Sequence, residues 1–113
     1  MATKELREPT FLLLSALANG PQHGYGLMQA ISESTLGEVT LRPGTLYTAL
    51  DRLTAEGLIT ITGQEIVDGR PRRYYDLTDQ GTAALTQAVD LMESRAKQAR
   101  SALRRRGFRE VTA

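Results

Sequence analysis

The spacing of apolar residues changes twice along this chain, and these two changes limit what it can fold into. Up to Gly57 the apolar residues recur at intervals of three and four, which is helical spacing. Over residues 58–77 apolar and polar residues alternate as in strands, and the dipeptide Asp68-Gly69 is typical of a hairpin turn. From Thr78 onward the spacing is helical again. The sequence therefore predicts an α+β fold with one hairpin between helices.

Local signals mark where the predicted helices begin and end. Pro43 suits the first turn of a helix, where no amide hydrogen is needed, and Gly57 suits the left-handed position just after a helix. Thr78 can accept a hydrogen bond from the first-turn amides of the last helix. The helices before the hairpin are predicted at residues 9–19, 23–36 and 43–56. Three short helices and a hairpin form a winged helix-turn-helix, which we assign to residues 1–78, with residues 79–113 as a dimerisation helix and basic tail.

The third predicted helix has an apolar side and a small polar side. When its leucines face a core, Gly44, Thr45, Thr48 and Arg52 point roughly away from it. Small residues allow a helix to approach DNA bases, hydroxyls donate or accept hydrogen bonds, and an arginine reaches guanine or phosphate. The alternative is an ordinary solvated helix face.

Basic residues gather in two places, although the formal net charge is only +1. Arg70, Arg72 and Arg73 follow the predicted hairpin turn, where they suit a minor groove or the phosphates beside it. By alternation Arg73 shares the inward face of Tyr75. The alternative is that these charges keep an edge hairpin soluble. A second basic run, residues 95–109, is explained by the preference of cations for a helix C-terminus and by a solvated tail.

Along the last predicted helix, apolar residues follow one another at intervals of four and three, which is heptad spacing. The helix is longer than a small winged-helix body can cover, since each residue adds about 1.5 Å. We therefore expect this stripe to pair with a second copy of the chain, most simply as a two-fold dimer. The alternative is that the stripe packs inside its own chain.

Several function classes are disfavoured. The chain has no cysteine, one histidine (His23), and no paired carboxylates at a spacing that suggests a catalytic site, so we expect no enzyme activity, metal or cofactor. His23 is interpreted as part of a helix start. The longest nearly apolar run, residues 11–18, is too short to span a bilayer, and a signal-peptide pattern is lacking. We expect a cytoplasmic protein without a membrane partner.

Three stretches, "HGYGLMQAI", "LRPGTLYTALDRLTAEGLI" and "GRPRRYYDLTDQGTAAL", together resemble the PadR family of bacterial transcriptional regulators, in particular its smaller subgroup with one C-terminal helix. The resemblance covers residues 23–85. It implies a dimer built from the first and last helices, a palindromic operator in double-stranded DNA, and repression. It also implies release by a small-molecule effector, often aromatic, at the dimer interface. Some small members hold flat ligands between tryptophans, which this chain lacks.

Carried over residue by residue, the resemblance and the patterns above define two candidate surfaces. The predicted DNA-facing residues are Tyr25, Pro43, Gly44, Thr45, Tyr47, Thr48, Arg52, Arg70, Arg72 and Arg73. The predicted dimer interface comprises Leu12, Leu13, Leu85, Val89, Met92, Ala96, Ala99 and Leu103. The sequence thus favours a dimeric, sequence-specific DNA-binding repressor. The alternative is a winged-helix protein-interaction module that does not bind DNA.

Overall fold

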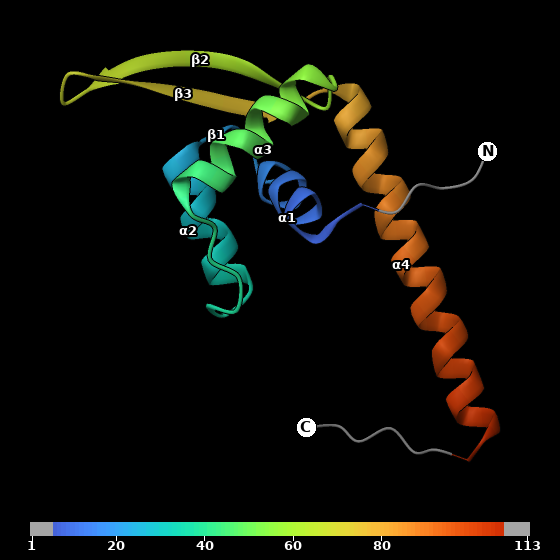
Figure 1. Ribbon diagram of the computed structural model, residues 1–113. Helices are drawn as coiled ribbons and strands as arrows, with labels where there is room; N and C mark the ends of the chain where they lie inside the picture. The colour runs from blue at the N-terminus through green and yellow to red at the C-terminus, as the bar shows by residue number, and fades with distance from the viewer. Residues whose placement is uncertain (1–5, 108–113) are drawn as a thin grey trace.

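The computed structural model of the protein describes residues 6–107 and has the predicted order of helices and strands, with one additional short strand (Figure 1). The elements are α1 (Glu8–Leu17), β1 (Gln22–His23), α2 (Gly24–Ser34), α3 (Pro43–Ala55), β2 (Ile59–Val67), β3 (Arg70–Leu77) and α4 (Asp79–Arg105). The strands form an antiparallel sheet in the order β1-β3-β2, and the long β2–β3 hairpin is the wing. The end of the predicted basic tail, with Arg109, lies outside the described residues. No helix in the described part of the chain is both long and apolar enough to cross a membrane.

The connection from the wing into α4 is held by Thr78. Its hydroxyl accepts a hydrogen bond from the Gly81 amide at 3.0 Å, as predicted, and donates one to the Gly57 carbonyl at 2.6 Å. Gly57 has a φ of +79°, so the predicted left-handed turn after α3 is confirmed. Gly81 lies against the Leu58 carbonyl so closely that a Cβ would overlap it. The N-terminal end of α4 is therefore fixed to the turn that follows α3.

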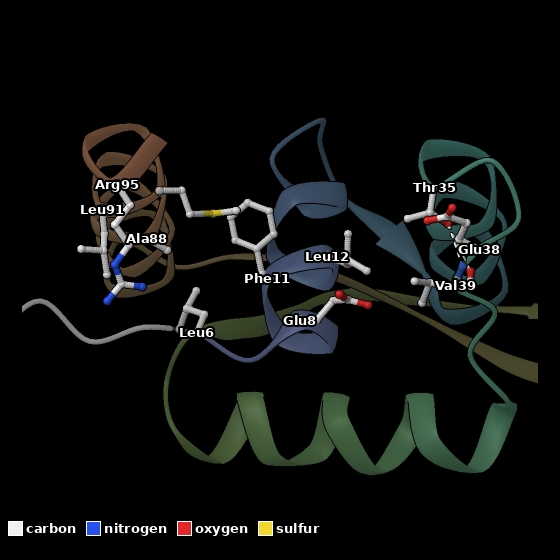
Figure 2. A pocket seen from close by; sticks show the side chains of 11 residues that line it. Leu6, Glu8, Phe11, Leu12, Thr35, Glu38, Val39, Ala88, Leu91 and Arg95 are labelled. Carbon is white, nitrogen blue, oxygen red and sulfur yellow. Dashed lines mark hydrogen bonds between the residues drawn. The ribbon is translucent and has the colours of Figure 1, made fainter. Parts of the chain in front are cut away.

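Only the first half of α4 packs on its own chain. Ala88 is buried, whereas Met92 and Leu103 are 52% and 45% exposed, and Ala96 and Ala99 are exposed too. A groove of about 420 Å³ crosses the outer side of α1, between α4 and the turn after α2 (Figure 2). It is lined by Leu6, Glu8, Phe11, Leu12, Thr35, Glu38, Val39, Ala88, Leu91, Met92 and Arg95. Within residues 6–107, the far half of the predicted stripe is thus exposed rather than packed on the body.

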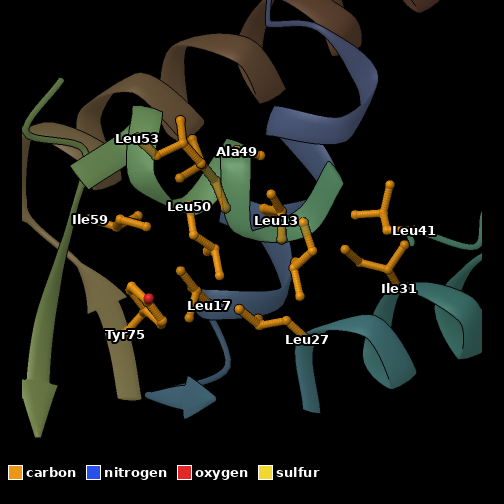
Figure 3. Packing of buried hydrophobic residues seen from close by; sticks show 12 residues of the cluster. Leu13, Leu17, Leu27, Ile31, Leu41, Ala49, Leu50, Leu53, Ile59 and Tyr75 are labelled. Carbon is orange, nitrogen blue, oxygen red and sulfur yellow. The ribbon is translucent and has the colours of Figure 1, made fainter. Parts of the chain in front are cut away.

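One apolar core joins the three short helices to the base of the wing (Figure 3). Leu46, Leu50 and Leu53 of α3 are fully buried, as the predicted stripe requires, and Tyr75 is buried as the wing's inward residue. Their neighbours in this core include Leu13, Leu14, Leu17, Leu27, Ile31, Leu41, Ala49 and Ile59. Each fully buried leucine contributes about 2 kcal/mol through the hydrophobic effect. The core therefore fixes which side of α3 remains exposed.

The position of Leu13 contradicts one prediction. We expected it in the dimer interface, but its side chain is 0% exposed and lies inside the core of its own chain. The physical reason is that successive residues of a helix point about 100° apart, so Leu12 and Leu13 face different sides of α1. Leu12 is only partly buried and lines the groove described above. The apolar run of α1 gave no indication of which leucine faces which side.

His23 begins α2 and also belongs to β1. Its Nδ1 accepts a hydrogen bond from the Gly26 amide at 3.1 Å, which makes it the N-cap residue, and this confirms its interpretation as a helix start. Burial in the first place, and then the nearby Arg72 guanidinium, lower the pKa of His23 below its ordinary value; the Glu65 carboxylate opposes this only in part. The neutral ring is the form that can cap, because protonation of Nδ1 removes the accepting lone pair.

The His23 cap predicts a dependence of stability on pH. Because the folded-state pKa is lowered, the unfolded chain takes up the proton first as the pH falls. The cap's contribution, typically about 1 kcal/mol for a good N-cap residue, is therefore present above pH about 6.5 and is lost at lower pH. In His23→Asn the side chain still caps but does not titrate. Urea unfolding followed by circular dichroism should show the free energy of unfolding of the wild type falling, relative to the variant, as the pH is lowered below about 6.5. Parallel pH profiles would contradict the assignment.

Candidate nucleic-acid interface

The N-terminal half of α3 presents a small, polar and exposed surface. Pro43 is the first residue of the helix, and Gly44, Thr45 and Thr48 follow on its exposed side. No atom lies within 4 Å of the position that a Cβ of Gly44 would take, so the backbone there is open to a partner. The buried leucines on the opposite side hold this surface in place. The outward orientation that the sequence predicted for these residues is confirmed.

Two hollows flank α3. The first lies toward α1 and is lined by Arg7, Pro9, Thr10, Gly44, Thr45, Thr48, Ala49 and Arg52. The second lies between the start of α2 and the wing and is lined by His23, Gly24, Tyr25, Tyr47, Asp51, Pro71, Arg72, Arg73 and Tyr75. Every predicted DNA-facing residue lines one of them except Pro43, which starts α3, and Arg70, which starts β3. The fold therefore gathers residues from α2, α3 and the wing around one exposed helix.

Two exposed tyrosines lie at the second hollow. Tyr25 is 59% and Tyr47 47% exposed, which is high for residues of this size. The Tyr47 ring lies so close to Gly24 that any side chain at that position would collide with its hydroxyl. Tyrosine hydroxyls donate hydrogen bonds to DNA phosphates, so exposed tyrosines beside an open helix suit a nucleic-acid surface.

The wing carries the three arginines on β3. Arg70 and Arg73 are exposed and Arg72 is partly buried; their partners across the ladder are Val67, Gln64 and Glu65, respectively. Arg73 shares a strand face with Tyr75, as the alternation predicted. It is nevertheless exposed, because the hairpin extends beyond the core at this point. Its position on the inward face of the strand is thus no obstacle to a contact with DNA.

Arg52 has contacts that the helical pattern did not predict. It lies in the last turn of α3, and its guanidinium donates to the Glu56 carboxylate at 3.3 Å and to the hydroxyl of the buried Thr10 at 2.8 Å. The ion pair with Glu56 is about half exposed and contributes little to stability. The bond to Thr10 joins α3 to α1. In the free protein Arg52 therefore links two helices, and a contact with DNA would require exchanging these bonds.

The structure also brings charged residues to this surface that the sequence reasoning missed. Arg7 lies at the first hollow, and no local signal connects it to α3, because α1 and α3 meet only in the folded chain. Asp51 lies at the second hollow and could have been found on the helical wheel, since it follows Gly44 by two turns. Glu65 lies opposite Arg72 on the wing. Within residues 6–107, no group of three histidine, aspartate or glutamate side chains could hold a metal ion.

Comparison with known proteins agrees with this geometry. Transcriptional regulator Rv3488 of Mycobacterium tuberculosis is 40% identical over 86 residues, which are 76% of this chain and 77% of that protein. Transcriptional regulator YqjI of Escherichia coli is 34% identical over 93 residues, which are 80% of this chain but 43% of that protein. Both are named as transcriptional regulators, in agreement with the expectation of a protein that is not an enzyme.

Solved structures of transcriptional regulators are also similar to this chain. Bacillus subtilis PadR in complex with operator DNA has a TM-score of 0.66 at 26% identity and covers 74% of this chain, which spans 47% of that one. A transcriptional regulator from Clostridium thermocellum has a TM-score of 0.69 at 26% identity, with 81% and 89% covered. The model of the transcriptional regulator PadR-like family matches residues 13–87. Because this match covers most of the chain, the protein belongs to the PadR-like family of transcriptional regulators.

Proposed function

We propose that the chain is a dimeric repressor that binds a palindromic operator in double-stranded DNA and is released from it by a small-molecule effector. The observation that carries this proposal is the position of the arginine-bearing wing beside the exposed, small and polar end of α3. The operator complex of the Bacillus relative supports it. A repressor of this kind acts on the chromosome, which agrees with the expected cytoplasmic location.

We propose that different parts of this surface contact different parts of the DNA. The N-terminal end of α3 enters the major groove, where Gly44 permits close approach and the hydroxyls of Thr45 and Thr48 contact base edges. Tyr25 and Tyr47 donate to phosphates of the same groove. The wing arginines bind the neighbouring phosphates or the minor groove.

The groove over α1 is the proposed seat of the partner's α4. Apolar side chains line it, among them Phe11, Leu12 and Leu91, and the stripe of α4 beyond Met92 lacks cover. Glu8 and Glu38 also line the groove, and the last turns of α4 are basic, so a second copy suits it in charge as well. In such a dimer two α3 helices enter successive major grooves about 34 Å apart.

The effector is proposed to bind between the two copies, at the part of this groove that Phe11 and Met92 line. Phe11 provides an aromatic surface, and Met92 is a flexible side chain that adapts to ligands of different shape. A ligand between the two copies changes the distance between their α3 helices. A change of a few ångströms withdraws one helix from its groove and removes most of the specific contacts.

DNA binding is tested by fluorescence anisotropy with a duplex that the wild type selects from a random library and with a scrambled duplex of equal composition. We expect a dissociation constant in the nanomolar range for the selected duplex, rising steeply with salt because bound phosphates release counterions. Absence of binding to both duplexes at low salt would favour the protein-interaction module instead.

Variants separate the proposed roles of the two surfaces. Arg70→Ala and Arg72→Ala should each weaken binding to both duplexes and reduce the salt dependence, because they remove phosphate contacts. Thr48→Ala should instead change which duplexes are selected, at a cost of about 1 kcal/mol on the original sequence. An equal loss on selected and scrambled DNA would remove Thr48 from base recognition.

The dimer is tested by analytical ultracentrifugation. Met92→Glu and Leu103→Glu each place a charge in the uncovered stripe and should shift the protein from dimer to monomer at micromolar concentration. Ser94→Glu adds the same charge on the opposite side of α4 and is the matched control, for which we expect a dimer. A monomeric wild type at this concentration would exclude the two-headed mechanism.

A further inference from the structure

The wing carries three acidic residues, Glu65, Asp68 and Asp76, beside its three arginines, and Glu65 lies in its middle. Glu65 of β2 stands directly across the ladder from Arg72 of β3. A carboxylate here repels the phosphates that the wing arginines are proposed to bind, and so lowers affinity for every DNA sequence. Its position therefore calls for a compensating role in the structure of the wing.

Glu65 is connected to the start of α2 through one aromatic side chain. The Tyr74 hydroxyl donates a hydrogen bond to Glu65 Oε1 at 2.6 Å. The Tyr74 ring meets the His23 ring edge-on, with centroids 5.5 Å apart and an interplanar angle of 89°. Tyr74 and His23 are also ladder partners between β3 and β1, and His23 caps α2. A continuous series of contacts therefore runs from the middle of the wing to the first turn of α2.

This series of contacts lies next to the least regular part of the hairpin. The pairing of β2 with β3 shifts between Ile61 and Gly63, so that Tyr75 faces Ile61 while Tyr74 faces Gly63. Such bulges bend and twist a hairpin. Glu65 and Tyr74 both lie on the outer side of this irregularity, and the contact of Tyr74 with His23 joins them to the body. The two contacts together therefore restrain the outer wing, which carries the arginines, relative to the body.

The hydroxyl of Tyr74 is suited to this task. The hydrogen bond to the Glu65 carboxylate is the largest of the effects that raise the pKa of Tyr74 above its ordinary value, and the nearby Arg72 opposes it in part. Like an ordinary tyrosine hydroxyl, that of Tyr74 is protonated and able to donate throughout the neutral range.

We propose that Glu65 is a positioning residue for DNA recognition, which through Tyr74 fixes the angle of the outer wing to α2 and α3. The inference rests on the proposed function as a DNA-binding regulator. Glu65 lowers affinity for DNA in general and increases the preference for a duplex whose phosphates match the fixed position of the arginines. Loss of Glu65 should therefore raise the affinity for DNA in general while it lowers the preference for the selected duplex.

The test compares Glu65→Ala, Glu65→Gln and Tyr74→Phe on the selected and scrambled duplexes, with Glu93→Gln on the exposed side of α4 as a matched change of charge. Glu65→Ala and Tyr74→Phe should each reduce the ratio of the two affinities about 3- to 10-fold, the range of a typical net hydrogen bond. The double variant should lose no more than either single one, because both remove the same contact. Glu65→Gln keeps an accepting oxygen, so it should keep the ratio while raising affinity for both duplexes. Glu93→Gln should leave the ratio unchanged.

A measurement without DNA distinguishes failure of this inference from failure of the proposed function. The heteronuclear ¹H–¹⁵N Overhauser effect reports backbone mobility on the picosecond to nanosecond timescale. It should fall at residues 64–72 in Glu65→Ala and Tyr74→Phe, and stay as in the wild type in Glu65→Gln. If mobility changes in this way but the wild type binds neither duplex, the proposed function fails. If the wild type binds DNA but the affinity ratio is unchanged in Glu65→Ala, or falls equally in Glu65→Gln, the inference is overturned.

Discussion

The burial of one side of α3 is the interaction on which the rest of the structure depends. Leu46, Leu50 and Leu53 are inaccessible to solvent and belong to the core that joins α1, α2 and α3 to the base of the wing. Because these side chains cannot leave the core without losing several kcal/mol, the rotation of α3 about its axis is fixed. The same constraint determines that Gly44 and Thr48 face outward. Small polar residues cannot by themselves fix the orientation of the proposed recognition surface, and the buried leucines on the opposite side of α3 do so.

The sequence predicted the fold well where a local signal reports on the final environment. The helical stripe of α3, the Asp68-Gly69 turn and the Thr78 cap each depend on residues close in sequence, and each prediction was confirmed. The failures depend on contacts between distant segments. Leu13 was assigned to the dimer because nothing local distinguishes it from Leu12. The bond from Arg52 to Thr10 joins residues 42 positions apart, and a two-residue strand such as β1 has no periodicity to detect.

The same reasoning explains why the candidate site was only partly predictable. Its basic and small residues follow from the pattern of α3 and from the composition of the wing. Its acidic residues, Asp51 and Glu65, have no sequence signal of this kind, because binding to phosphates favours positive charge. Their place beside the arginines becomes apparent only when the strands are paired and α3 is placed against the wing. The net charge of +1 agrees with this arrangement, in which basic residues are concentrated locally rather than in excess.

Two neighbouring sides of α4 differ in whether they are buried against the body. One side carries Ala88 and is buried against α1, whereas the stripe through Met92 and Leu103 continues past the end of the body. A helix covered along its whole length by its own chain would leave no apolar area for a partner to cover. Here the covered half fixes the direction of the helix through Thr78 and Gly81, and the uncovered half offers apolar area at a fixed distance from α3. In the proposed dimer the position of the second copy is thereby tied to the proposed DNA-binding surface, and both assembly and operator spacing then depend on the same fixed N-terminal end of α4.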